Sequence, residues 1–336
     1  MLKFGDFEFM SEEIEYVDGI PVRAEPLGFA PAEMIECGRC GKANPPVRME
    51  CIYCGERLEL PETVAAGIQY RHVVPEEWEP GVNVVVAGGL LNADRDMISR
   101  TVSIDAETLE KAFCLQPPFP LVRATKGDAG SVSERLGKAG LEITVCLDGY
   151  LNVDRPPARL KALSFDGGGV EFILFNGDAV ERFSKDEIVL IVSGAIFETE
   201  SESTLKRKRK EVRRVGEQTS SWDHAVIDIY AEGHDAGFRI LPHGFDFSCL
   251  GEGKSMLSVE NVRTLKDQLM ENFPNAVFDD SYASKIGLLD GVWPRSVRNT
   301  SKGFHRVGAR VQRSVGEAVS NADQFTKYSR MRRGLL

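Results

Sequence analysis

Apolar and polar residues change their spacing several times along this chain, and each spacing predicts its own kind of element. Two segments, 105–113 and 259–273, place apolar residues on one helical face and predict amphipathic helices. A run of Val, Ala, Gly and Leu over 82–91 predicts a strand. Residues 115–150 show strand, helix and strand patterns in turn, with Gly140 placed to end the helix, and predict a compact β-α-β unit.

After a break at 154–157 the apolar residues alternate with a period of two, as in half-buried strands. Asp166-Gly167-Gly168-Gly169 is a hairpin turn in this interpretation, because it lacks the following helix and the Gly-Lys-Ser/Thr signature of a phosphate loop. A polar insertion at 198–221 interrupts the strands, and we expect it to be a loop. The predicted strands are 160–165, 170–175, 188–197, 225–231 and 238–241.

The two ends of the chain have weaker patterns. Near the start, alternating apolar residues on both sides of Asp18-Gly19 predict a short hairpin. From residue 301 onward, valines recur every fourth position with arginines between them, which predicts a narrow helix in a tail that docks on a partner. These valines are Val307, Val311, Val315 and Val319.

Composition places the chain among folded proteins of more than one domain. Its 336 residues exceed one average domain, and 42% hydrophobic with 27% charged residues is normal for globular proteins. Residues 1–13 lack the basic and apolar regions of a signal peptide, and no run of about 18 uncharged apolar residues occurs. We therefore expect a cytoplasmic protein without a membrane span.

Four of the seven cysteines form two closely spaced pairs, Cys37-Gly-Arg-Cys40-Gly and Cys51-Ile-Tyr-Cys54-Gly. Two residues between paired thiolates let both sulfurs face one ion, and four thiolates satisfy the tetrahedral preference of Zn²⁺. With all four ligands from protein, the ion has no open position for a substrate, so we expect one structural zinc. A redox dithiol is the competing interpretation of a Cys-x-x-Cys pair.

This segment resembles the short bacterial zinc-ribbon family, whose Cys-x-x-Cys-Gly-x-x-Asn-Pro and Cys-x-x-Cys-Gly pattern is matched through Gly41, Asn44, Pro45 and Gly55. His72 is a conceivable surplus ligand, but we interpret it as a solvated loop histidine. The other cysteines, Cys114, Cys146 and Cys249, lie in apolar sequence and are expected to be buried thiols.

The expected fold class is therefore α+β and multi-domain. Residues 158–275 resemble a pleckstrin-homology-like domain in the order of their elements, and the β-α-β unit resembles small ferredoxin-like or signal-transducer modules. The whole arrangement is similar to uncharacterised bacterial zinc-ribbon proteins, so this resemblance implies no activity. The predicted segments are an extension (1–33), the ribbon (34–62), a small α+β domain (81–153), a β-rich domain with a closing helix (158–275) and a basic tail (294–336).

Charge is distributed unevenly over the chain, whose net charge is -10. Residues 295–336 hold ten Lys and Arg against Glu317 and Asp323, and a second basic run lies at 206–214. The basic tail suggests an anionic partner or an acidic surface of the same protein, and for the second run a solvated hairpin loop is the preferred interpretation over phosphate binding. The candidate anion-binding residues are Lys206, Arg207, Lys208, Arg209, Lys210, Arg213, Arg214, Arg306, Arg310 and Arg313.

No catalytic pattern frames the remaining chemistry-bearing residues. His224, His234 and His243, with Asp223, Asp228 and Asp246, would permit a metal or acid-base site only if the fold brought them into one cleft. We therefore predict a non-enzymatic adaptor that recognises a protein partner with an acidic surface. The alternative is an RNA-binding or DNA-binding protein, which is weakened by the acidic total and by acidic residues around the ribbon.

Overall fold

The computed structural model describes most of the chain and divides it into two compact units, residues 1–70 and 71–336. The described residues are 15–17, 20–22, 34–45, 48, 50–58, 72, 74–76, 78–177, 179–208, 211–307 and 310–336.

The described residues of the first unit include two short hairpins. Strands β1 (Glu15–Val17) and β2 (Ile20–Val22) pair antiparallel, so the predicted N-terminal hairpin is confirmed. Strands β3 (Ile35–Glu36) and β4 (Ala43–Asn44) form the second hairpin, inside the cysteine-rich segment.

The second unit begins with a three-stranded sheet in the order β6 (Phe119–Ala124), β5 (Val82–Gly88), β7 (Glu142–Leu147). Because β5 is antiparallel to both neighbours, β6 and β7 run parallel, and α4 (Lys126–Lys138) connects them. Residues 115–150 thus contain the predicted elements, with β5 inserted between the two strands. The remaining helices here are η2 (Leu90–Asn92), α2 (Arg95–Val102), α3 (Ala106–Phe113) and α5 (Asp148–Leu151).

A larger sheet of nine strands follows, and it is mostly antiparallel. Its order is β10-β9-β8-β13-β12-β11-β16-β15, with β14 (Val277–Asp279) paired to β11. The strands are β8 (Ala158–Phe165), β9 (Gly169–Leu174), β10 (Val180–Ser184), β11 (Ile188–Lys208), β12 (Glu211–Ala231), β13 (Phe238–Ile240), β15 (Ser296–Val307) and β16 (Arg310–Ser320).

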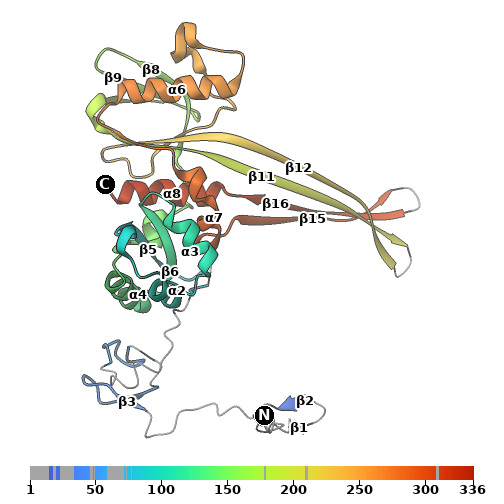
Figure 1. The fold of residues 1–336 in the computed structure, drawn as a ribbon. Helices are drawn as coiled ribbons and strands as arrows, with labels where there is room; N and C mark the ends of the chain where they lie inside the picture. Colours follow the sequence, from blue (N-terminus) through green and yellow to red (C-terminus); the bar gives the residue numbers. More distant parts are fainter. Residues whose placement is uncertain are drawn as a thin grey trace, which may run out of the picture. The chain divides into compact units, whose positions relative to one another are not determined.

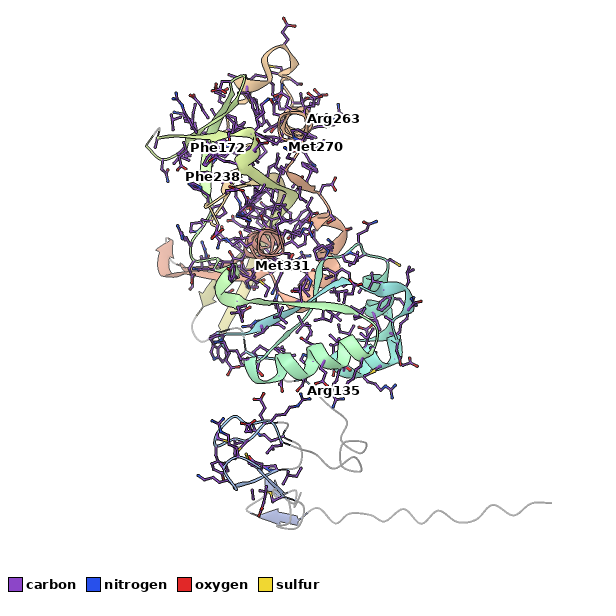
Figure 2. All side chains as sticks on the ribbon, turned by 90° about the vertical axis from the view of Figure 1, so that its left-hand side faces the viewer. Arg135, Phe172, Phe238, Arg263, Met270 and Met331 are labelled. Atoms are coloured by element: carbon purple, nitrogen blue, oxygen red, sulfur yellow. The ribbon has the colours of Figure 1, made fainter. Side chains whose placement is uncertain are left out.

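One core lies between this sheet and α6 (Ser258–Asn272), as the apolar spacing of 259–273 predicts. Leu265 and Leu269 of α6 are fully buried together with Phe172 and Phe238, whose ring centroids are 4.9 Å apart. Figure 2 shows these two rings on the sheet below α6. The 3-10 helices η3 (Lys185–Glu187) and η4 (Phe247–Gly253) connect neighbouring elements.

A second core joins parts of the chain that the sequence had assigned to three segments. Val85 of the small sheet, Tyr230 of β12 and Met331 of α8 (Ala322–Gly334) belong to one buried cluster. α7 (Tyr282–Val292) contributes Tyr282 to it. The segments 81–153, 158–275 and 294–336 are therefore parts of one compact unit, because each contributes residues to this second core, while the buried residues of the first core all come from 158–275.

The predicted basic tail is the largest correction. Residues 294–336 form β15, β16 and α8, and α8 buries Phe325, Tyr328 and Met331 completely. The helix expected from the valine spacing is wrong, since a spacing of four is also a multiple of the strand period of two. The guanidinium of Arg330 donates to the carbonyls of Leu151, Asn152, Arg155 and Ala236, so part of the tail's charge is used inside the fold.

The polar insertion at 198–221 is also not a loop. β11 and β12 continue as paired strands through it, and β16 pairs with β11 from Glu198↔Ser320 to Arg207↔Val311. We call the resulting four-stranded projection, residues 198–224 and 296–320, the arm (Figure 1). Its described side chains are mostly polar and exposed, so it lacks the apolar face from which strands are usually recognised.

A hydrogen-bonded asparagine, Asn321, lies where the strands of the arm join the second core. Asn321 is fully buried, accepts from the Phe197 N–H at 2.6 Å and donates to the Ala195 carbonyl at 3.1 Å and the Tyr282 hydroxyl at 3.0 Å. Gly194 lies beside it, and a Cβ there would come within 2.6 Å of the Phe325 ring. Glycine therefore lets α8 pack against the base of the arm.

No helix in the described ranges is long and apolar enough to cross a membrane.

We predict that Asn321→Ala lowers the free energy of unfolding by about 2 kcal/mol, because it leaves a buried N–H and a buried carbonyl without partners. Chemical denaturation followed by circular dichroism measures the loss. The control is Asn299→Ala in the exposed part of β15, which should change stability by less than about 0.5 kcal/mol. Equal effects of the two substitutions would contradict the role of Asn321.

Candidate metal centre and basic arm

The four predicted zinc ligands come together. The sulfur atoms of Cys37, Cys40, Cys51 and Cys54 all lie within 4.8 Å of one another. The Cys37 and Cys54 sulfurs are 3.6 Å apart, and those of Cys40 and Cys51 are 3.5 Å apart. Each short distance joins one knuckle to the other, so the two pairs face a common point.

These distances fit a tetrahedral tetrathiolate. With metal–sulfur bonds of about 2.3 Å, the sulfurs of a regular tetrahedron lie about 3.8 Å apart. A disulfide would require about 2.05 Å, which none of these pairs approaches. The donor set therefore suits a divalent ion such as zinc. When bound, zinc would close the segment through four thiolates and leave no position for a reacting molecule.

Both knuckles use the same backbone design. The Cys37 N–H donates to the Lys42 carbonyl at 3.0 Å, and the Cys51 N–H donates to the Glu56 carbonyl at 2.7 Å. Gly41 and Gly55 end the knuckles with φ of 65° and 74°, the left-handed region in which a side chain would be strained. No atom lies within 4 Å of a Cβ built on either glycine, so there is space for a side chain at both positions. Glycine is therefore required there by the backbone conformation and not by lack of space.

Asn44 connects the two knuckles. Its side chain is fully buried, accepts from the Ile52 N–H at 2.9 Å and donates to the Lys42 carbonyl at 2.7 Å. The same amide nitrogen lies 3.5 Å from the Cys51 sulfur. The asparagine of the family pattern therefore orients a ligand from behind, in the manner of outer-shell groups at metal sites.

The environment of Cys51 favours its thiolate. Burial alone would raise the pKa of this thiol, but the N–H groups of Tyr53 and Cys54, with Cys40 and Asn44, lower the pKa to about 6. A thiolate near neutral pH is the form that coordinates a metal.

Other cysteines and His72 depart from the expectations in part. Cys146 is buried, Cys249 is half-buried and Cys114 is exposed, so the prediction of a buried thiol is wrong for Cys114. It caps the C-terminal end of α3, where the helix turns back to solvent. His72 is only 7% exposed, not solvated, and burial lowers its pKa. It is not a member of the cysteine cluster.

The backbone register brings the two predicted basic runs to one place. Lys206 lies opposite Arg213 on β12 and Gln312 on β16, and Leu205 lies opposite Arg214 and Arg313. One position further along, Val311 of β16 lies between Arg207 of β11 and Arg306 of β15. The two hairpins therefore end side by side and at the same level of the arm.

Of the candidate anion-binding residues, Arg209 and Lys210 lie outside the described residues. The others occupy the end of the arm by register: Lys206, Arg207, Lys208, Arg213, Arg214, Arg306, Arg310 and Arg313. Other arginines of the predicted tail have internal partners. Arg295 pairs with Asp290, and Arg332 pairs with Asp279. Sequence spacing did not reveal the convergence, because β11 and β16 are far apart in the chain.

The histidine and aspartate candidates have separate surroundings. Asp228 is fully buried and paired with Arg239 at 2.7 Å, while His234 faces Glu181 at 3.4 Å and Asp246 caps η4 through Ser248. Within the described ranges, the cysteines form the one group of three or more Cys, His, Asp or Glu side chains close enough to share an ion.

A buried polar network that sequence analysis missed links α7 to α8. The Lys285 ammonium donates to the Tyr328 hydroxyl at 2.9 Å and the Ser281 hydroxyl at 2.8 Å, and Tyr328 donates to Asp279 at 2.8 Å. Burial lowers the pKa of Lys285 to about 8. Because Lys285 is only 1% exposed and its neighbours satisfy it, a substrate has no access, and the network acts as a structural tie.

Comparison with known proteins adds no relative: no protein-family model, no curated protein and no solved structure matches this chain. The zinc-ribbon resemblance is therefore supported by the cysteine cluster alone, and the pleckstrin-homology-like resemblance stays a prediction.

We predict one zinc ion per chain in protein purified under reducing conditions. Cys51→Ser should reduce the zinc content severalfold, because a hydroxyl is a poor replacement for a thiolate in a four-sulfur site. The exposed Cys114→Ser is the matched control and should keep its zinc. Elemental analysis of both proteins checks this, and wild-type protein without zinc would refute the site.

We also predict that Asn44→Ala weakens zinc binding by about tenfold, the usual cost of losing an outer-shell partner. Competition with a chromogenic chelator measures the affinity. Substitution of exposed Arg39 by Ala, which removes an ion pair to Glu56 on the surface of the same knuckle, is the control and should leave affinity nearly unchanged.

Proposed function

We propose that this chain is a non-catalytic nucleic-acid-binding protein, with a zinc-stabilised ribbon and an arm whose basic end contacts phosphates. The observation that carries the proposal is the pairing of β11 with β16, which joins two basic runs into one. This pairing is why we prefer nucleic-acid binding, the alternative in the sequence analysis, to the protein adaptor. Two basic runs that are separate in the sequence form one concentrated region of positive charge.

The charge at the end of the arm is strongly one-sided. Residues 204–214 and 302–314 contain eleven Lys and Arg and a single acidic residue, Glu211. Polyphosphates bind such surfaces mainly by releasing counterions, and each neutralised phosphate adds to the affinity. The arm carries this charge away from the body of the second unit (Figure 1), whose acidic residues would otherwise repel phosphate.

A second role, protein binding, is supported at the ribbon. Ile52 and Tyr53 lie between two zinc ligands and are 50% and 56% exposed, although both have large apolar surfaces. The ribbon's Glu36, Glu50 and Glu56 are exposed and acidic, which disfavours phosphate there. The adaptor function from the sequence is therefore proposed for the ribbon, with zinc fixing the shape of the knuckle, in a cytoplasmic protein.

The test is binding of the full chain to fluorescent nucleic acid of mixed sequence. A variant with Lys206, Lys208, Arg306 and Arg310 replaced by Gln should bind at least about tenfold more weakly at 0.15 M salt. The control replaces four exposed cations elsewhere in the second unit, Arg100, Lys111, Lys126 and Lys138, by Gln.

Both variants lose the same charge, so a general electrostatic effect predicts equal losses. Our proposal predicts that only the arm variant is weakened, with the unfolding midpoints of both close to wild type. Wild-type protein that binds no nucleic acid, or a control as weak as the arm variant, would refute it.

A further inference from the structure

The end of the arm also has a shape, and that shape limits which nucleic acid it fits. This inference rests on the function proposed above. Four strands lie side by side in the order β12-β11-β16-β15. At about 4.8 Å between neighbours, the outer strand axes are roughly 14 Å apart, before side chains are added. The end of the arm is therefore a broad edge and not a single ribbon.

A broad edge does not enter a groove. The major groove of B-form DNA is about 12 Å wide and admits a helix or a two-stranded ribbon. Four strands laid across the groove are wider than this opening, so in that orientation they rest on the rims of the groove, where the phosphates of the two nucleic-acid strands lie. The matched level of the two hairpins suits this arrangement: Arg207 lies opposite Val311, and Val307 opposite Arg310 closes the second hairpin beside it.

The residue types at the end of the arm offer few groups on which the bases of a single strand could stack. Proteins that bind single-stranded nucleic acid stack successive bases on aromatic side chains. Residues 204–214 contain no aromatic residue, and residues 302–314 contain only Phe304 and His305. Phosphate contact without stacking favours a backbone with two closely spaced rows of charge, as in a duplex.

The same residues give little means of reading sequence. Apart from arginine and lysine, which also bind phosphate, and from Ser and Thr, which contact either kind of base, the groups that hydrogen-bond to a particular base in the major groove are Asn, Gln, Asp and Glu. Within these two stretches only Gln312 and Glu211 belong to that set.

We infer that the end of the arm binds the phosphates of both strands of a nucleic-acid double helix, with one hairpin on each rim of a groove and without regard to base sequence. Double-stranded DNA and double-stranded RNA share this chemistry. An acidic protein surface is the competing occupant of a different class, and the experiment below includes it.

The experiment measures binding of the full chain to labelled 24-base-pair duplexes of two unrelated sequences, as DNA and as RNA, and to the separate strands. At equal salt we expect at least one type of duplex to bind about tenfold more tightly than its own single strands, since the end of the arm offers only Phe304 and His305 as aromatic stacking residues. The two sequences should agree within about threefold, as expected for backbone contact. Unlabelled poly-glutamate at matched charge should compete poorly.

Two variants test the use of both hairpins. The first replaces Lys206, Lys208 and Arg213 by Gln, and the second replaces Arg306, Arg310 and Arg313 by Gln. In a plot of log affinity against log salt concentration, each variant should have a line that is shallower than wild type by about 2 to 3 in slope. This is the change expected from three lost phosphate contacts. The four-residue control of the preceding subsection should keep the wild-type slope.

The outcomes separate the two proposals. Tighter binding to single strands than to duplexes, strong preference for one sequence, or an effect of only one hairpin variant would overturn this inference but leave nucleic-acid binding in place. Poly-glutamate that competes as well as duplex would overturn it in favour of an acidic protein. Absence of binding to any nucleic acid would overturn both proposals.

Discussion

The antiparallel pairing of β11 with β16 determines the shape of the second unit. It joins two hairpins that are separated in sequence by β13, α6, β14 and α7, and it places them in one sheet from Glu198↔Ser320 to Arg207↔Val311. Near the body, the fully buried Asn321 ties this pair of strands to α7, and Gly194 allows α8 to pack beneath it. Because β16 leads directly into α8, the core of the unit and the direction of the arm are set together.

The ribbon depends on a different constraint. Among its described residues, Cys37, Cys51 and Leu58 make up the small apolar cluster at its centre. Such a small core stabilises little by apolar burial, so we expect the metal to supply most of the stability of this segment. The repeated knuckle, with its left-handed glycine and the bridging Asn44, prepares the sulfurs for that ion.

The parts of this structure that could be predicted are those whose signals are local. Cysteine spacing identified the cluster, the apolar spacing of 259–273 gave α6, and residues 115–150 gave strand, helix and strand. The arm escaped because the described residues of its strands are mostly polar, so the apolar alternation that marks a half-buried strand is weak. The valines of β16 were equally consistent with helix and strand, and the strand prevailed because β11 offered a partner for its backbone.

The sequence alone showed the two basic runs of the arm but not that they lie together. Each was visible as a run of Lys and Arg, but their meeting depends on a register set by contacts between distant parts of the chain. Conversely, the ten Lys and Arg assigned to a tail included arginines such as Arg330 and Arg332, which the fold uses internally. Counting charges along the sequence therefore overestimated the positive charge that the tail has available for a partner. It underestimated the positive charge that gathers at the end of the arm.

Hydrogen exchange of the full chain with and without nucleic-acid duplex tests the central claim most directly. The account predicts slower amide exchange at both hairpin ends, around 204–214 and 302–314, with unchanged exchange in the ribbon at 37–58. Protection of the ribbon instead, or of one hairpin without the other, would contradict it.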